Sequence, residues 1–150
     1  MAIGIGHLGN TKRREEVIRE YEKKGHTIEK IIAPTAIINH EVTLGDGVAI
    51  LDGVILQPSV IIGDYSIVNT KASIDHDCRI GKHVHIAPGV TLSGNVTVGD
   101  RVLVGVGASV IQGVTIEDDC IIGAGSAVTH NCDKKGGTYV GSPAKLVKKK

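Results

Sequence analysis

The stretch of this sequence with the clearest potential for chemistry is IDHDCR, at residues 74–79. Its histidine, His76, lies between two acids, Asp75 and Asp77, and two residues before a cysteine, Cys78. A histidine beside a carboxylate can act as a general base, because the carboxylate orients the imidazole and stabilises its cation. The same residue types bind metal ions and also occur in solvated turns. The elements around the stretch must decide between these three interpretations.

A six-residue repeat provides those elements. From Ile32 to Asp133 the chain divides without gaps into hexads whose first residue is Ile, Val or Leu and whose fifth is Val, Ala, Ser or Cys. Related triplets recur 18 residues apart, as in LGD at 44 and IGD at 62, so three hexads form one turn of a solenoid. We expect coils with three short sides, stacked as parallel strands. The first and fifth residues should point inward, the sixth outward, and the third should lie at a corner.

The composition fits a narrow aliphatic core. The 150 residues include 20 Gly and three Tyr but no Phe or Trp. A net charge of +1 gives no strong attraction to nucleic acid or to a membrane surface. Because the sequence shows no signal peptide and no run of about 18 apolar residues, we expect a soluble cytoplasmic protein. We divide it into a strand–helix–strand unit at 1–31, the repeat domain at 32–145 and a basic tail at 146–150.

The N-terminal unit contains GIGHLG at residues 4–9, which matches the G-x-G-x-x-G pattern of dinucleotide sites. Such a site needs a full strand before the glycines, and only Met1 to Ile3 precede them. We therefore interpret the motif as a strand-to-helix turn that requires small residues. The helix should run from Asn10 or Thr11 to Lys24, with Gly25 ending it.

The hexad positions sort the reactive side chains. Cys78, Cys120 and Cys132 all take the inward fifth position, which favours small buried hydrophobic residues over a nucleophile or zinc ligands. His76 takes a corner position, and the residue one turn above it is Gly94, which should leave open space over the imidazole.

One outward column is apolar. His85 takes a sixth position, in a column that reads Ala49, Ile67, His85, Leu103 and Ile121. A soluble protein seldom leaves such a stripe in water. We therefore predict that the stripe is an oligomer interface and that His85 lies in it.

Several motifs together resemble a known family. They are GIG…NTKRREEV, APTA at 33–36, VNTKASIDHDCRIGKHVHIAPGVTLSGNVTVGD and the closing VGSPAK. From about Gly4 to Lys145 the chain resembles the acetyl-CoA-dependent sugar acetyltransferases, which include sialic acid O-acetyltransferases and bacillosamine-type N-acetyltransferases of nucleotide-linked amino sugars. The resemblance implies an all-β, left-handed parallel β-helix after a short α/β remnant, a homotrimer, acetyl-CoA as donor and no metal. Family members usually begin with a further strand and helix that hold the nucleotide, and we expect this chain to lack them.

The same resemblance implies roles for individual residues. His76 would be the general base, and Asp77 would raise its basicity. His85 and the backbone at Gly94, Val106 and Ala124 would line the acetyl-CoA channel between subunits. Gly4 and Asn69 would contact the sugar or nucleotide-sugar acceptor. Transfer would be direct, with His76 taking a proton from the acceptor amine or hydroxyl as it attacks the thioester.

Two other functions remain open. The trimeric γ-carbonic anhydrases share this β-helix and hold zinc with three histidines across a subunit interface, and His76, His83 and His85 could supply such a set. A catalytically inert trimeric scaffold is the second alternative.

Overall fold

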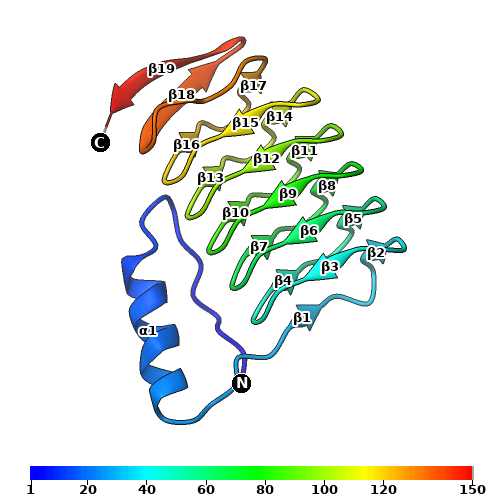
Figure 1. Cartoon of the computed structure of the whole chain (residues 1–150), viewed down its shortest axis with the longest axis vertical. Coiled ribbons are helices and arrows are strands. Elements are labelled where there is room, and N and C mark those ends of the chain that lie inside the picture. Colours follow the sequence, from blue (N-terminus) through cyan, green and yellow to red (C-terminus); the bar gives the residue numbers. More distant parts are fainter. Residues whose placement is uncertain (150) are drawn as a thin grey trace.

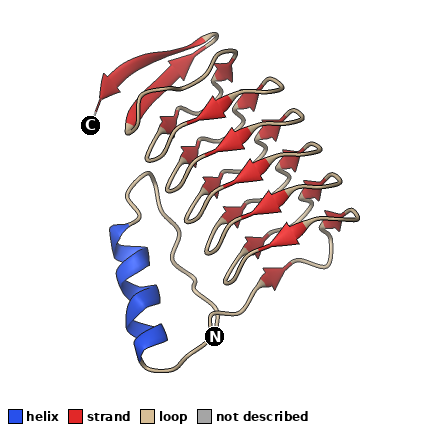
Figure 2. Ribbon diagram, viewed as in Figure 1, coloured by secondary structure: helices blue, strands red, loops and turns tan. Residues whose placement is uncertain are grey.

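The computed structural model describes residues 1–149 and shows a three-sided parallel β-helix with one α-helix beside it (Figure 1). The helix, α1, spans Lys12–Lys23, close to the expected bounds. Within the described residues the first strand begins at Ile31, so the strand expected before α1 is absent. Residues 1–11 are an irregular segment instead (Figure 2).

Each of the first five coils contributes one two-residue strand to each of three sheets. Sheet A contains β1 (Ile31–Ile32), β4 (Ala49–Ile50), β7 (Ile67–Val68), β10 (His85–Ile86), β13 (Leu103–Val104), β16 (Ile121–Ile122), β18 (Gly137–Gly141) and β19 (Ala144–Lys149). Sheet B contains β2 (Ile37–Ile38), β5 (Ile55–Leu56), β8 (Ser73–Ile74), β11 (Thr91–Leu92), β14 (Ser109–Val110) and β17 (Ala127–Val128). Sheet C contains β3 (Thr43–Leu44), β6 (Ile61–Ile62), β9 (Arg79–Ile80), β12 (Thr97–Val98) and β15 (Thr115–Ile116).

The register confirms the 18-residue turn. Ser73 pairs with Thr91, and Arg79 with Thr97, each in parallel with the strand one coil above. The third and fourth residues of each hexad form the corners, and the fourth often has a left-handed backbone, as at Asp77 with φ 61°. Each corner is therefore held between the coil below and the coil above.

The core is aliphatic, as the hexads predict. From Val48 to Cys132, residues at first and fifth positions are buried, including Val48, Ile50, Val54 and Leu56, which are all 0% exposed. A fully buried side chain of this size contributes about 1.5–3 kcal/mol relative to an exposed one. The three cysteines are buried in the same inward positions.

The N-terminal segment covers the apolar stripe on sheet A. Gly9 has a left-handed backbone, and a Cβ atom there would lie 2.6 Å from the Cδ1 atom of Ile121, so a larger residue would be strained and would push this side chain aside. The ring of His7, which is buried, meets the ring of His85 edge-on at a centroid distance of 5.4 Å. Within one chain this segment thus covers part of the stripe, and the oligomer interface predicted there stays a prediction. The apolar pattern shows that the stripe needs a cover, but it does not show which segment supplies it.

The C-terminal end closes the β-helix. β18 pairs in parallel with β16, and β19 then returns antiparallel along β18. Residues 146–149 therefore extend a hairpin, in contrast to the basic tail expected at 146–150, and Lys150 lies outside the described residues. Tyr139 is buried at this end, and its hydroxyl accepts the N–H of Lys134 at 3.0 Å. Such a cap is what the last coil of a solenoid needs.

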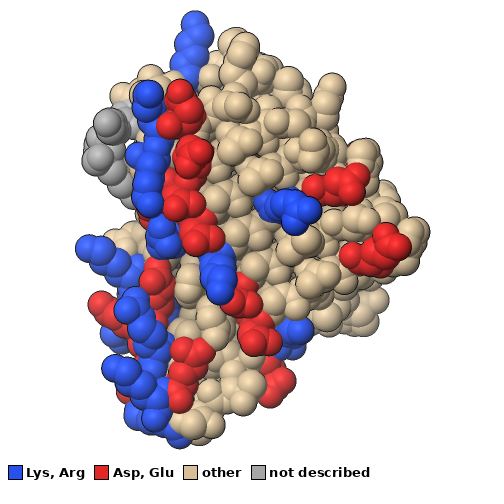
Figure 3. Space-filling view, in the orientation of Figure 1, with Lys and Arg blue, Asp and Glu red and all other residues tan. Residues whose placement is uncertain are grey.

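Charged side chains gather along one corner. Figure 3 shows a stripe of acidic and basic residues beside the helix, whereas the surface over sheet C carries few charges. Part of the stripe is structural. The carboxylate of Asp100 accepts the backbone N–H of Lys82 at 2.8 Å, and a Cβ atom at Gly81 would lie 2.5 Å from it. The glycine of the triplet therefore leaves room for the acid one coil above.

Candidate active site

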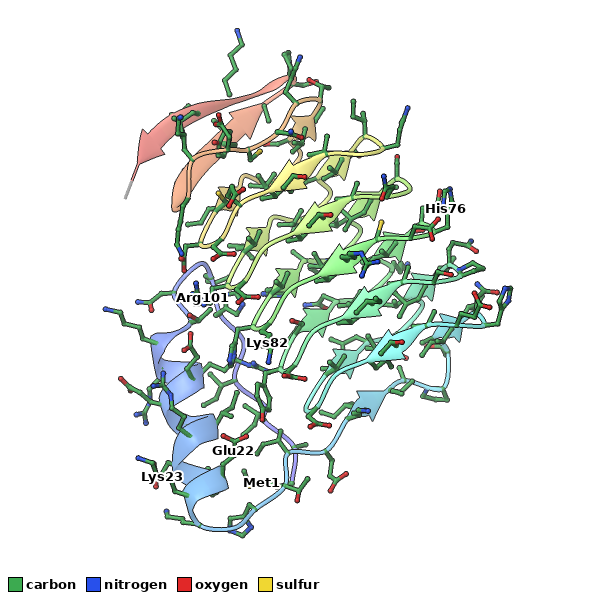
Figure 4. The ribbon with its side chains drawn as sticks, viewed as in Figure 1. Met1, Glu22, Lys23, His76, Lys82 and Arg101 are labelled. Carbon is green, nitrogen blue, oxygen red and sulfur yellow. The ribbon has the colours of Figure 1, made fainter. Side chains whose placement is uncertain are left out.

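The corner between β8 and β9 presents His76 and Asp77, at the edge where sheet B turns into sheet C. The coil below fixes this corner through the N–H of Asp77, which donates to the carbonyl of Pro58 at 3.2 Å. The coil above fixes it through the N–H of Asn95, which donates to the carbonyl of His76 at 2.8 Å. Figure 4 shows His76 at the edge of the molecule farthest from the helix. The two side chains therefore project from a rigid frame.

His76 and Asp77 form a close pair. The Nδ1 atom of His76 lies 2.8 Å from a carboxylate oxygen of Asp77, and both side chains are about 60% exposed. The hydrogen bond to Asp77 raises the pKa of His76 above its ordinary value, and the charges of Asp75 and Asp77 add to this rise. In the neutral tautomer that this bond favours, Nδ1 carries the proton. Nε2 is then the basic nitrogen, as a general base requires.

Gly94 packs against the imidazole from the coil above. A Cβ atom at this position would lie 2.6 Å from both Cε1 and Nε2 of His76. The space predicted over the histidine is therefore filled by its own ring, which rests against the glycine. Among the described residues, the backbone N–H of Gly94 has no hydrogen-bond acceptor.

Two hollows flank this pair. One, of about 570 Å³, is lined by His76, Asp75, Ser93, Gly94, Asn95 and Gln112, among others. The other, of about 550 Å³, lies over sheet C and is lined by Asp77, Arg79, Asn95, Ser59 and Glu41, among others. Asn95 belongs to both, so the two hollows meet beside the His76–Asp77 pair.

Asn69 and His85 also come together, but on another face. The Nδ2 atom of Asn69 lies 3.1 Å from Nε2 of His85, and Nδ1 of His85 lies 2.9 Å from the carbonyl of His7. His85 thus donates through Nδ1 and accepts from Asn69 through Nε2. Both residues belong to sheet A or its end, which is the face opposite the corner that carries His76.

The remaining predicted residues lie elsewhere. Val106 and Ala124 are exposed on successive coils at the corner between sheets A and B. Gly4 is exposed in the N-terminal segment, and a Cβ atom there would meet nothing within 4 Å. One chain therefore joins His76, Asp77 and Gly94 into a single site, but it does not bring the other predicted residues to them.

The three histidines of the zinc alternative are also separated. His83 stacks on Tyr65, with ring centroids 5.2 Å apart, at the corner between sheets C and A. His85 lies in sheet A and His76 at the opposite corner. Within residues 1–149, no three His, Cys, Asp or Glu side chains gather as ligands for a metal ion.

The cysteines are poor nucleophiles. Burial raises the pKa of Cys78 and of Cys120, and it raises the pKa of Cys132 to about 12. A thiol with a raised pKa stays protonated near neutral pH, whereas the thiolate is the reactive form. These three side chains therefore belong to the core.

Arg14 and His7 were not singled out from the sequence. Arg14 is 3% exposed, and its guanidinium donates to the carbonyls of Ile5 and Tyr65, which ties the helix to the N-terminal segment and the β-helix. The position of Arg14 in the sequence could have indicated this role. Arg14 lies one turn before Val17 and Ile18 on the apolar face of the helix, where a charged residue needs a buried partner.

A larger hollow, of about 730 Å³, lies between the start of α1 and the charged corner. Two of the cations that line it are held by acids of the charged corner. Arg101 makes two bonds to Asp119, at 2.7 and 3.1 Å, and Lys135 bonds Asp118 at 3.1 Å. No histidine is among the residues that line this hollow.

The comparisons with known proteins agree with this fold. The family model described as bacterial transferase hexapeptide (six repeats) matches residues 59–94, and the hexapeptide repeat of succinyl-transferase matches residues 95–130. No curated protein matches the chain. No helix among residues 1–149 is long and apolar enough to span a membrane.

Three solved structures are similar over most of the chain. PerB from Caulobacter crescentus, in complex with CoA and GDP-perosamine, is 40% identical with a TM-score of 0.90, and the match covers 94% of this chain and 68% of PerB. The acetyltransferase domain of PglB from Neisseria gonorrhoeae, in complex with acetyl coenzyme A, is 32% identical with a TM-score of 0.87. This match covers 93% of this chain and 68% of the PglB chain. WeeI from Acinetobacter baumannii is 29% identical with a TM-score of 0.89, and the match covers 93% of this chain and 68% of WeeI. The chain therefore belongs to the hexapeptide-repeat sugar acetyltransferases.

Proposed function

We propose that this protein transfers the acetyl group of acetyl-CoA to the amine of a nucleotide-linked amino sugar, with His76 as the general base. The observation that carries this proposal is the pairing of His76 with Asp77 against Gly94, beside an open hollow. Two similar structures support the choice of substrates. PerB binds CoA and GDP-perosamine, and the PglB domain binds acetyl coenzyme A.

The reaction would proceed by direct transfer. The acceptor nitrogen attacks the thioester carbonyl, and Nε2 of His76 takes the proton that this nitrogen loses. The carbon–sulfur bond then breaks, and the imidazolium returns the proton to the sulfur of CoA. Asp77 holds the ring and stabilises its cation during both steps. Proton transfer of this kind contributes about 10²–10⁴ in rate.

The backbone N–H of Gly94 would stabilise the oxyanion of the tetrahedral intermediate. It lies beside the ring of His76 and has no acceptor among the described residues. Loss of one such donor typically costs about 10²–10³ in kcat. A covalent acetyl-cysteine route is disfavoured, because Cys78, Cys120 and Cys132 are all buried.

The full site would need two copies of the chain. The corner of His76 and the corner of Val106 and Ala124 lie at different edges of the prism, with sheet B between them, so we expect neighbouring copies to bring the two together around one acetyl-CoA. We propose a homotrimer in which acetyl-CoA lies between neighbouring copies. His7 covers His85, so His85 would act indirectly, by holding the amide of Asn69 toward the acceptor. Gly4 would lie along the same acceptor path.

We also propose a compartment. The substrates proposed above are cytoplasmic metabolites, so the protein would act in the cytoplasm.

Calorimetric titration with acetyl-CoA, with molar mass recorded on the same sample, tests this proposal. We expect one site per subunit in a trimer, followed by acetylation of an amino sugar linked to GDP or UDP. An intact trimer that does not bind acetyl-CoA would contradict the proposal. Acetylation of a hydroxyl acceptor in preference to the amine would overturn its N-acetyl assignment.

A further inference from the structure

Arg79 is an exception on the surface of the β-helix. Each strand from β1 to β17 points one side chain outward, and Arg79 on β9 is the only Lys, Arg, Asp or Glu among these. Its neighbours on the coils below and above are Ile61 and Thr97. The surface over sheet C accordingly shows few charges (Figure 3). A single cation on such a face needs an anionic partner.

Within the described part of the chain, Arg79 makes no ion pair and no side-chain hydrogen bond, although it is exposed. The two carboxylates that share its hollow are engaged elsewhere. Glu41 accepts the hydroxyl of Ser59 at 3.1 Å, and Asp77 holds His76 at 2.8 Å. By contrast, Arg101 at the charged corner is bound to Asp119 through two bonds. The guanidinium of Arg79 therefore keeps its hydrogen-bond donors for a group from outside this chain.

Arg79 is also close to the base. It lies two positions after Asp77 in the chain, which is at most about 7 Å of backbone. It lines the hollow on the sheet C side of the His76–Asp77 pair. Asn95 lines both this hollow and the one that contains His76. A molecule with its amine at His76 and an anionic group about one sugar ring away could therefore reach Arg79.

We propose that Arg79 is a specificity-determining residue that binds the phosphate on the anomeric carbon of the acceptor sugar. This inference rests on the proposed function and adds to it the recognition of the acceptor. A guanidinium presents a planar fork of donors that matches phosphate oxygens. The donor substrate is a poor match, because the pantetheine arm of acetyl-CoA places its own phosphates far from the reacting thioester. Both a sugar 1-phosphate and a nucleoside-diphosphate sugar carry the required phosphate.

Steady-state kinetics of the whole protein tests this assignment. The acceptors are one amino sugar in three forms: free, as its 1-phosphate and as its nucleoside diphosphate. We expect Arg79→Gln to raise KM for the two phosphorylated acceptors about 10-fold, with kcat and KM for acetyl-CoA nearly unchanged, as for the loss of a charge-assisted hydrogen bond. Arg79→Lys should recover part of the loss. Lys23→Gln, on the helix at the opposite side of the molecule (Figure 4), is the control and should change nothing.

The comparison between acceptors separates recognition from general damage. Equal changes in KM for the free and phosphorylated sugars would overturn the proposal, and so would no change for any of them. A rise in KM for the nucleoside-diphosphate sugar alone would overturn the assignment to the anomeric phosphate, because Arg79 would then contact the distal phosphate. An effect that appears instead with a carboxylate-bearing acceptor would also overturn it.

A second measurement keeps the two proposals distinct. If the wild type acetylates none of these sugars, the proposed function fails, and direct titration of the sugar 1-phosphate then decides the role of Arg79. Binding about 10-fold weaker in Arg79→Gln than in the wild type would support the phosphate contact. Equal binding, or none in the wild type, would refute it.

Discussion

Gly94→Ala tests the packing of the proposed base most sharply. The new Cβ would lie 2.6 Å from Cε1 and Nε2 of His76, whereas an ordinary contact begins at 3.4 Å, so the ring must move by about 0.8 Å. A misplacement of about 1 Å in a reacting group can cost about 10² in rate. We expect kcat to fall about 30- to 100-fold, with KM for acetyl-CoA less affected. The substitution keeps the backbone N–H, so the proposed oxyanion donor is unchanged.

Stability separates this effect from misfolding. The backbone of Gly94 is not left-handed, and the ring that must move is largely exposed, so alanine should fit without unfolding the coil. Replacing glycine at such a site stabilises a protein by about 0.4–1 kcal/mol through the unfolded state. Thermal unfolding should therefore be unchanged or slightly higher. Gly6→Ala, where nothing lies within 4 Å, is the matched control. A Gly94→Ala protein with kcat within about 3-fold of the wild type would refute the placement of the base.

Three further predictions follow from the same contacts. Asp77→Asn removes the main cause of the raised pKa of His76. Because the base must be neutral, the acid limb of the kcat/KM profile should move to lower pH and the plateau should fall; an unmoved limb would exclude the pair from the reaction. Arg14→Met leaves the carbonyls of Ile5 and Tyr65 without their donor, so we expect a loss of about 1–3 kcal/mol and faster hydrogen exchange in residues 1–24. Unchanged exchange would show that Arg14 does not hold the segment. The pKa of His7 is lowered to about 4, mainly by burial and then by the charges of nearby groups. The unfolded chain therefore takes up the proton first, and stability should fall by up to roughly 3 kcal/mol as pH drops from 6.5 toward 4. Urea unfolding at several pH values should show this loss in the wild type and a smaller one in His7→Leu; equal slopes would contradict it.

The sequence predicted the coils well because one local rule repeats in every turn. Each hexad places an aliphatic residue at the same inward position, so an atypical residue in one hexad does not obscure the pattern set by the hexads around it. The register of Ser73 with Thr91 follows directly from the 18-residue turn. The corner site was predictable for the same reason. Residues 18 apart must stack, so His76 had to meet Gly94.

The contacts of the N-terminal segment could not be predicted in this way. No repeat relates His7 to His85 or Gly9 to Ile121, which are far apart in sequence and meet only after the β-helix has formed. The outward stripe on sheet A was read correctly as a surface that needs a cover, but hydrophobicity is not directional and cannot name the cover. The same applies to the C-terminal hairpin, where the hexads end and β19 turns back on β18.

The separation of His76 from sheet A makes the proposed reaction depend on the trimer. His76 stands at one corner and the pair of Asn69 and His85 on the opposite sheet, so the proposed site depends on how copies of the chain meet. Dilution below the dissociation constant of the trimer should therefore abolish transfer even though each chain stays folded.

The most direct test of the account is acetyl transfer by His76→Ala, measured by mass spectrometry with acetyl-CoA and a nucleotide-linked amino sugar. His40 is the matched control, because it occupies the same hexad position next to an acid, Glu41, but has Pro58 above it in place of a glycine. We predict that His76→Ala loses transfer by about 10² or more while acetyl-CoA binding and molar mass stay as in the wild type, and that His40→Ala remains active. Activity that survives in His76→Ala would contradict the assignment of the base.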